Sequence, residues 1–533
     1  MATTDPRRAV AVLRLPPIRD YGTPGWYARL PRGVGTGGIL ALLLVMTLFI
    51  RVHYLDGQLW SDEANTVGIA THSLSSIPGV LWRGGGAPLY FWLLHVWMSM
   101  FGDGPIALHA LSVVFGVLTV PVGMWLGWSL FGRRVGLMLA TLMAFNPFLT
   151  AYAEEARPYE LLALLGLIAF GSYLHVFVLR HRRGWLVGLT ASLALLVYTD
   201  AWGFVVWAAA LLALIPVARR SEDPAGVLRD AAIAFGGAFV VYLPWLPTVI
   251  HQAATATAPW HYAPLEGANF VRDTFGGDRV STIFGLAAVL ALVPLLRGDE
   301  RRGHLATAVV ATAALLLGVI VLSGAATLEV PLTARYLALV IAPLLMLVAI
   351  ACARSGVVGL VVLIVSCMLL ASPGSFIPVD KSDMKDVAGE MGPYLTRGDV
   401  VLSTAPEQAP LAWYYLPRGL GFATMLGPDS HPSYMDWDNA QTLLQRSNAQ
   451  RGVARLVASM HPGQRLLLLR PLSEGVTNWS QAWSKLVRLR AAQWAGAVVS
   501  DPELRELPGV IAPHNYYRGA CCIASFALVF VKR

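Results

Sequence analysis

The sequence predicts a polytopic α-helical membrane protein that ends in an α/β domain outside the membrane. Of its 533 residues, 56% are hydrophobic and only 14% are charged, whereas a soluble protein carries about 25% charged residues. The mean hydropathy is +0.58. Apolar segments of span length recur as far as residue 370, with short arginine clusters between them. Beyond residue 373 charged and polar residues return, and no further span-length segment occurs.

The net charge is +8 and the isoelectric point is near 9.4. The arginines stand in short clusters between apolar segments, which is typical of cytoplasmic loops and not of a nucleic-acid-binding surface. Residues 1–33 carry six arginines, so we expect the N-terminal segment to be cytoplasmic.

About eleven spans are expected, the first over residues 34–50. The next apolar stretch, 89–101, is too short to cross about 30 Å of hydrocarbon at about 1.5 Å per residue. We expect it to form a helix against the outer face, within a long first outer loop over 51–104. The remaining spans are expected at 106–130, 136–151, 159–179, 185–199, 201–217, 231–250, 281–296, 304–322, 336–352 and 357–370.

The positions of the arginine clusters test this topology. Counting 89–101 as a span would place Arg133-Arg134 outside and reverse every later loop, against the positive-inside rule. The chosen topology predicts a multi-pass protein of the inner (plasma) membrane. Its parts are a cytoplasmic segment over 1–33, a membrane domain over 34–372 and an extracytoplasmic α/β domain over 373–533.

The C-terminal part alternates between two kinds of segment. The runs 399–402 and 465–469 are short and apolar, as buried strands are, and helical patterns cover 381–395, 439–446 and 478–494. This alternation predicts a small α/β domain.

An acidic pair, Asp62-Glu63, stands in the first outer loop. Residues just outside a span are often merely solvated, but ionisable groups beside a membrane also mark functional sites. Trp60 suggests the membrane interface, the loop 84–88 is rich in small residues, and a second charged cluster is expected on the same face. These features favour a functional role for the pair.

The second cluster is Glu154-Glu155-Ala156-Arg157. Glu154 and Arg157 are three residues apart and would share a face on a helical turn. Either they form a local ion pair, or Arg157 binds an anion while a carboxylate orients it or holds a metal. Arg335, at the mouth of a later span, offers a forked guanidinium suited to phosphate.

The outer loop 251–279 adds His261 and Tyr262 as candidate sugar contacts, although a lone loop histidine is a weak signal. We expect Asp200 to cap the helix that follows it. The sequence has no P-loop, dinucleotide-binding or zinc-ligand spacing.

Several short motifs occur in a fixed order over roughly the first 370 residues. They are Asp62-Glu63-Ala64, Gly86-Ala87-Pro88-Leu89-Tyr90, Arg133-Arg134 with Gly136, Glu155-Ala156-Arg157-Pro158-Tyr159, Tyr242-Leu243-Pro244-Trp245-Leu246-Pro247 and Arg335-Tyr336. Their order resembles the bacterial glycosyltransferase superfamily C, with the nearest likeness to protein O-mannosyltransferases and lipid A aminoarabinose transferases. Members often show Pro-Pro-Leu-Tyr where this chain has Ala87-Pro88, a departure that bears on the acceptor groove.

The resemblance implies a multi-span fold, a polyprenyl-phosphate sugar donor and Asp62 as catalytic base, with Glu63 in support. The implied phosphate-binding residues are Arg157, Arg335 and, more loosely, Arg83. Supporting residues for the acceptor or a metal are Glu154, Glu155, Tyr159, His261 and Tyr262. No cofactor is required by the sequence, and a divalent ion such as Mg²⁺ or Mn²⁺ stays open.

The expected reaction moves a sugar to a hydroxyl of a cell-envelope acceptor, with mannose as first choice and arabinofuranose or another pentose as the alternative. The base takes the hydroxyl proton, and cations stabilise the departing lipid phosphate. The acceptor is a glycolipid, a polysaccharide or a protein, and no nucleic acid is involved. Two other classes stay open, a lipid-linked sugar transporter or flippase and a non-catalytic assembly protein. A transporter would favour charges within spans and two repeated halves.

Overall fold

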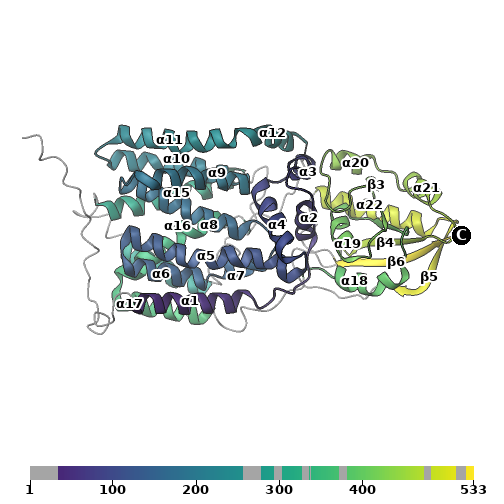
Figure 1. Ribbon diagram of the computed structural model, residues 1–533, viewed down its shortest axis with the longest axis horizontal. Coiled ribbons are helices and arrows are strands. Elements are labelled where there is room, and N and C mark those ends of the chain that lie inside the picture. Colours follow the sequence, from purple (N-terminus) through teal and green to yellow (C-terminus); the bar gives the residue numbers. More distant parts are fainter. Residues whose placement is uncertain are drawn as a thin grey trace, which may run out of the picture.

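The computed structural model describes residues 34–255, 278–292, 303–326, 335, 338–370, 381–472, 482–511 and 524–533. Figure 1 shows two parts, a bundle of long helices and a smaller sheet-containing part at one end of the bundle. Three short helices, α2, α3 and α4, lie between them.

The bundle helices run mostly along the long axis of the molecule (Figure 1). They are α1 (Val34–Arg51), α5 (Pro105–Phe131), α6 (Arg133–Ala144), α7 (Pro147–Ala153), α8 (Tyr159–Tyr173, continued by a π-helical turn over Leu174–Val178), α9 (Arg183–Thr199), α10 (Gly203–Arg220), α11 (Pro224–Tyr242), α12 (Leu246–Thr255), α14 (Asp278–Leu292), α15 (His304–Ala326), α16 (Ala338–Arg354) and α17 (Gly356–Leu370).

Within the described part of the chain, five helices are long and apolar enough to cross a membrane. They are α5, α8 with its π-helical turn, α10, α11 with α12, and α15; the pair α6 and α7, bent by 48°, makes a sixth if counted as one span. The protein is thus a multi-pass membrane protein. The predicted number of about eleven spans is not confirmed, because other apolar helices, such as α16 and α17, are only 17 and 15 residues long.

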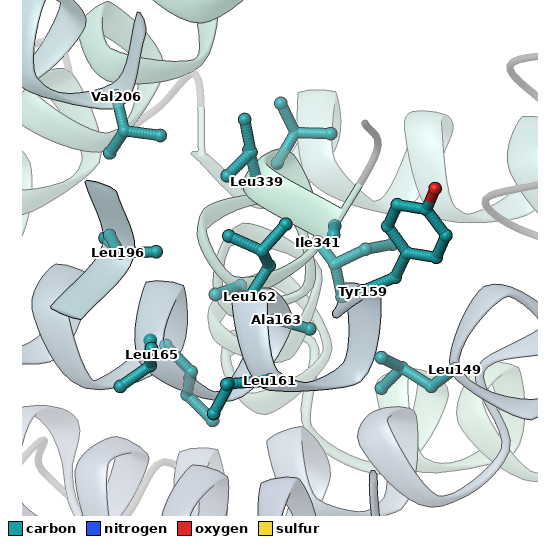
Figure 2. Packing of buried hydrophobic residues seen from close by; sticks show 14 of the residues in the cluster. Leu149, Tyr159, Leu161, Leu162, Ala163, Leu165, Leu196, Val206, Leu339 and Ile341 are labelled. Atoms are coloured by element: carbon teal, nitrogen blue, oxygen red, sulfur yellow. The ribbon is translucent and has the colours of Figure 1, made fainter. Parts of the chain in front are cut away.

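Helix α8 lies at the centre of the bundle. It is hydrophobic on all sides and buried along almost its whole length, as expected for a helix surrounded by other helices. Figure 2 shows Leu162 of α8 facing Leu339 and Ile341 of α16. The outer helices instead expose large apolar side chains, such as Phe49 of α1 and Met368 of α17, a surface suited to lipid.

The first outer loop contains more structure than the sequence analysis predicted. A helix forms over the expected 89–101 stretch, as α4 (Pro88–Phe101), but α2 (Ser61–Ala70) and α3 (Ile77–Gly84) precede it. These two helices are short, so their sequence periodicity is weak. Buried contacts with the C-terminal part stabilise them instead.

The C-terminal part is a mixed six-stranded sheet with the strand order β3-β2-β1-β4-β6-β5. Its strands are β1 (Val400–Ser403), β2 (Gly421–Thr424), β3 (Gly427–Asp429), β4 (Arg465–Leu472), β5 (Leu504–Ile511) and β6 (Ala524–Lys532). Its helices are α18 (Met384–Met391), α19 (Ala409–Tyr415), α20 (Ala440–Arg446), α21 (Ala449–Ser459) and α22 (Ala482–Val499). Strand β1 is parallel to both neighbours, and Val400 lies opposite Gly421 of β2 and Leu466 of β4. The predicted strands and helices of this part all have counterparts here.

The two parts are in close contact. A Cβ added to Gly68 of α2 would lie 1.5 Å from the Ser433 carbonyl oxygen, so only glycine permits this approach. The Leu59 amide donates to the Tyr415 hydroxyl at 2.8 Å, and the Ser382 hydroxyl donates to the Leu59 carbonyl at 2.6 Å. The segment that leads into α2 is therefore held by the C-terminal part.

Candidate active site

Helix α2 carries the acidic pair on its first turn, not in an open loop as the sequence suggested. Glu63 stands at the third helical position, and its carboxylate accepts a hydrogen bond from the Trp60 amide at 3.3 Å. Such a bond satisfies one of the free N–H groups at a helix start. Trp60 is buried, so the prediction that it marks the membrane interface is wrong.

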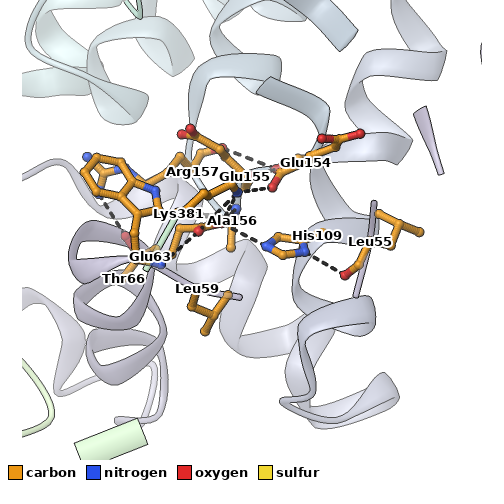
Figure 3. Close-up of polar contacts among 12 residues, drawn as sticks. Leu55, Leu59, Glu63, Thr66, His109, Glu154, Glu155, Ala156, Arg157 and Lys381 are labelled. Atoms are coloured by element: carbon orange, nitrogen blue, oxygen red, sulfur yellow. Dashed lines mark hydrogen bonds and ion pairs between the residues drawn. The ribbon is translucent and has the colours of Figure 1, made fainter. Parts of the chain in front are cut away.

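Glu63 joins four segments of the chain (Figure 3). Its Oε1 accepts from the Ala156 amide at 2.7 Å and from His109 Nε2 at 2.9 Å. Lys381, from the start of the C-terminal part, donates to Glu63 Oε2 at 3.2 Å. The second ring nitrogen of His109 faces the Leu55 carbonyl oxygen at 2.8 Å, so both ring nitrogens have a hydrogen-bond partner.

The Glu63 side chain is fully buried. Burial by itself would raise the pKa of its carboxyl group, but Lys381, His109 and the Ala156 amide outweigh this effect and lower the pKa to about 2. Glu63 is therefore ionised at neutral pH and already surrounded by donors. Such a carboxylate is well suited to fix geometry and poorly suited to take a proton.

Asp62 has different surroundings, since 36% of its side chain is exposed. Arg335 Nη1 donates to Asp62 Oδ2 at 3.1 Å, and Arg157 Nη2 lies 3.5 Å from the same oxygen. Among the described residues, Oδ1 accepts no hydrogen bond. Asp62 thus has one oxygen beside a guanidinium pair, while its side chain stays partly exposed.

Tyr159 sets the position of the two arginines. Its hydroxyl accepts from Arg335 Nη1 and from Arg157 Nη2, each at 3.2 Å. The Arg157 guanidinium also donates to Thr66 of α2 at 2.9 Å. Figure 2 shows the Tyr159 hydroxyl directed away from the apolar side chains of the core. The Tyr159 ring is buried in the bundle, and its hydroxyl holds the guanidinium groups of Arg157 and Arg335 in place.

Glu154 and Glu155 lie beside this cluster. Burial raises the pKa of each carboxyl group to about 7, and the nearby Lys381 ammonium opposes the rise. Lys381 also donates to the Glu154 carbonyl oxygen. Both carboxyl groups therefore change protonation near neutral pH.

The predicted helical turn over Glu154 and Arg157 is wrong. The residues between Ala153, the end of α7, and Tyr159, the start of α8, form an irregular turn. The residue before a proline disfavours helical geometry, and Arg157 precedes Pro158. Within this turn the Ala156 amide donates to Glu63 and not to a helical backbone carbonyl.

Asp200 accepts a hydrogen bond from the Trp202 amide at 2.9 Å within the turn between α9 and α10. The predicted cap is wrong in position, because Trp202 and not Asp200 is the N-cap residue of α10. Burial raises the pKa of the Asp200 carboxyl group, and the charges of Arg157 and Arg335 lower it.

Arg83, a predicted contributor, does not contact this cluster. It pairs with Asp436 of the C-terminal part at 3.3 Å, and both side chains are almost half exposed. The predicted contributors His261 and Tyr262 lie outside the described residues.

Sequence reasoning missed three residues near the acidic pair, namely His109, Lys381 and Glu407. A histidine inside an otherwise apolar predicted span was a usable signal, because buried ionisable groups in such segments tend to have partners. Lys381 and Glu407 belong to a different part of the chain. Only the tertiary structure brings them to α2.

The described residues contain no group of three or more histidine, cysteine or acidic side chains arranged to hold a metal ion. A cation already lies among the carboxylates, because the Lys381 ammonium contacts Glu63 and lies close to Glu155.

A scan against protein-family models and a search of curated protein sequences find no match. Solved structures do match. The chain is similar to ArnT from Cupriavidus metallidurans bound to undecaprenyl phosphate, with a TM-score of 0.57 and 13% identity over 95% of this chain and 98% of that chain.

Two further similarities have the same character. AglB, the Archaeoglobus fulgidus oligosaccharyltransferase, was solved with an inhibitory peptide and a dolichol-phosphate; it gives a TM-score of 0.53 at 11% identity, over 82% of this chain and 69% of that chain. A mutant of the arabinofuranosyltransferase AftD from Mycobacteria gives 0.52 at 15% identity, over 92% of this chain and 41% of that chain. The chain thus shares the fold of these three membrane glycosyltransferases, in agreement with the fold that the motif resemblance implied.

Proposed function

We propose that this chain is an integral-membrane glycosyltransferase that moves a sugar from a polyprenyl-phosphate donor to a hydroxyl of a cell-envelope acceptor. The observation that carries this proposal is the half-open Asp62 carboxylate beside two ordered guanidinium groups, those of Arg157 and Arg335. Base and anion-binding groups are then within one small site, as transfer from a lipid phosphate requires.

In this mechanism Asp62 acts as general base. Its Oδ1 takes the proton of the acceptor hydroxyl while the oxygen attacks the anomeric carbon of the donor. The bond between that carbon and the phosphate oxygen breaks, and the lipid phosphate leaves with the electron pair. A single displacement of this kind inverts the anomeric centre.

Arg157 and Arg335 bind the donor phosphate and stabilise the charge that develops as it leaves. Their spacing is fixed in advance by Tyr159, and preorganised cations of this kind contribute strongly to transition-state stabilisation. Arg83 is the looser candidate that the resemblance implied, but its guanidinium pairs with Asp436, so we expect it to contribute little to donor binding.

Glu63 is a positioning residue that holds α2 and the 154–158 turn together. Glu154, Glu155 and Tyr159 line the same region, and we keep His261 and Tyr262 as candidate acceptor contacts. A divalent ion such as Mg²⁺ or Mn²⁺ would bind Glu154 or Glu155 in their ionised forms. Loss of transfer on chelation, restored by either ion, would support that role.

We propose eleven spans, with the first outer loop over 51–104 and the domain over 373–533 on the extracytoplasmic side of the inner membrane. This number is reached if the five long spans, the bent pair α6 and α7 as one span, and the five shorter apolar helices all cross the membrane. The segment 1–33 would be cytoplasmic and 34–372 would form the membrane domain. Reporter fusions at residues 155 and 450 test this, and a cytoplasmic position for either contradicts a shared outer site.

The donor sugar we propose is mannose, with arabinofuranose or another pentose as the alternative. The fold similarity to an arabinofuranosyltransferase favours keeping the pentose in the test. A lipid-linked sugar flippase is the alternative of another class, and it would move the donor without cleaving it.

The test is an assay of the purified protein in liposomes with radiolabelled polyprenyl-phosphate mannose or pentose and a membrane acceptor extract. Asp62→Asn should lower transfer by about 10³-fold, while Asp56→Asn, an exposed carboxylate of the same loop, should leave it unchanged. No transfer with any donor, or full activity of Asp62→Asn, would falsify the proposal. Movement of intact donor across the bilayer would instead support the flippase.

A further inference from the structure

One arginine is completely buried at the edge of the helical bundle. Arg51 is the last residue of α1 and has no exposed surface. Helix α1 packs against α5, α6 and α7. A buried guanidinium is costly unless acceptors or an opposite charge surround it, so its neighbours show what stabilises it there.

The first neighbour is the break between α6 and α7. Arg51 Nη2 donates a hydrogen bond to the Met143 carbonyl oxygen at 2.8 Å. In a regular helix this oxygen would accept from the amide four residues later, but that residue is Pro147, which has no N–H group. The two helices are bent by 48° at this point. Arg51 therefore replaces the missing backbone donor at the bend.

The second neighbour is Glu160, on the first turn of α8. A Cβ added to Gly116 of α5 would lie 2.5 Å from Arg51 Nη1 and 2.7 Å from Glu160 Oε2, so the polar ends of both side chains lie against the same glycine. Glu160 is fully buried, and neither of its oxygens has a hydrogen-bond partner among the described residues. The Arg51 guanidinium thus faces this carboxyl group, and Gly116 leaves room for both.

These contacts lie at the two ends of one segment. The bend precedes α7, and Glu160 follows the 154–158 turn, which joins α7 to α8. That turn holds the Ala156 amide on Glu63 at 2.7 Å and carries Arg157 of the guanidinium pair. A single buried side chain therefore contacts the start of the segment and faces its end.

We propose that Arg51 and Glu160 are positioning residues for the donor site, which hold the 154–158 turn from within the bundle and thereby set the position of the Arg157 guanidinium. This inference rests on the proposed glycosyltransferase function, in which Arg157 binds the donor phosphate. Glu63 holds the same turn from α2, so the turn is fixed from two directions. A displacement of about 1 Å in such a group costs about 10²-fold in rate.

The variants separate positioning from general stability. Arg51→Met alone leaves Glu160 buried without its cation and loses stability for that reason. The double variant Arg51→Met/Glu160→Gln removes both ionisable groups and should melt closer to wild type. Asp230→Asn is the matched control, because Asp230 is a fully buried carboxylate beside Arg180 and Arg182, which follow the opposite end of α8.

The first measurement is steady-state transfer in liposomes with the polyprenyl-phosphate sugar that supports it. In the double variant, kcat/KM for the donor should fall about 10²-fold with the acceptor KM unchanged. Asp230→Asn should keep the donor kcat/KM of wild type. An unchanged donor kcat/KM in the double variant, or an equal fall in Asp230→Asn, overturns the inference while the proposed function stands.

The second measurement does not depend on transfer. The amides of Glu155, Ala156 and Arg157 each donate a hydrogen bond in the folded chain, so hydrogen exchange reports on the 154–158 turn. In the double variant this turn should exchange at least about tenfold faster than in wild type, with β4 unchanged. Equal exchange in both proteins, or faster exchange throughout the chain, rejects the positioning role.

A steric variant covers the case in which the double variant has no cooperative melting transition. Gly116→Ala displaces both side chains without removing either, and Gly236→Ala, whose Cβ would meet no atom within 4 Å, is its control. Only the first should speed exchange of the turn, and equal exchange in both overturns the inference. If wild type transfers no sugar, the proposed function fails on its own and the exchange measurement decides the positioning of the turn.

Discussion

Two adjacent carboxylates on one helical turn have opposite surroundings. Glu63 is fully buried and accepts hydrogen bonds from Trp60, His109, Ala156 and Lys381. Asp62 is 36% exposed and keeps one oxygen without a partner among the described residues. The same chemical group thus serves as a structural centre on one side and as an available base on the other. Burial and the number of donors make the difference.

The largest effect is expected at the buried carboxylate. The test removes either member of the ion pair between Glu63 and Lys381. Glu63→Gln and Lys381→Met should each lower the free energy of unfolding by about 3 kcal/mol, because each leaves a buried charge without its partner. The double variant should lose less than the sum. Chemical denaturation in detergent measures this, with the exposed Lys385→Met as control. Additive losses would contradict the coupling.

The surroundings of the exposed Asp62 are tested through the guanidinium groups that contact it. Arg335→Lys keeps the charge but loses the forked geometry shared by Asp62 and Tyr159. We expect kcat to fall about 10²-fold with an unchanged melting temperature. Steady-state kinetics with varied donor concentration measure this. A loss of stability equal to that of Glu63→Gln would contradict the division between a structural Glu63 and a catalytic Asp62.

Glu155 provides a smaller, pH-dependent test, because its carboxyl group lies near both Lys381 and Arg157. Burial raises the pKa of its carboxyl group to about 7, above the ordinary value of a glutamate. The folded state therefore holds this proton more tightly than the unfolded state, and its stability falls as pH rises from about 4.5 to 7. Glu155→Gln should raise the melting temperature by about 2 °C at pH 8 and much less at pH 5. An equal shift at both values would contradict the raised pKa.

The smallest effect is expected at Arg83, which pairs with Asp436 and contacts neither Asp62 nor Glu63 among the described residues. Its ion pair with Asp436 is half exposed, and exposed pairs contribute about 0–1 kcal/mol. Arg83→Ala should leave donor KM within about twofold of wild type. A large rise in donor KM would return Arg83 to the phosphate site, where the family resemblance had placed it.

The sequence predicted much of this arrangement for identifiable reasons. Long apolar segments and arginine clusters are local signals, so the helical bundle and the α/β character of the C-terminal part could be predicted. The helices α2 and α3 could not, since short helices depend on their buried contacts more than on their propensity. The irregular turn at Arg157 was missed because the spacing of charges does not reveal the local effect of Pro158.

The candidate site divides in the same way. By itself the sequence determined which side chains have the chemistry, because Asp62, Glu63, Arg157 and Arg335 are ionisable groups at the ends of apolar segments. Only the tertiary structure decided which carboxylate is open and which is closed. That distinction depends on donors from distant segments, His109 from α5 and Lys381 from beyond the last bundle helix. Such long-range burial leaves no local pattern in the chain.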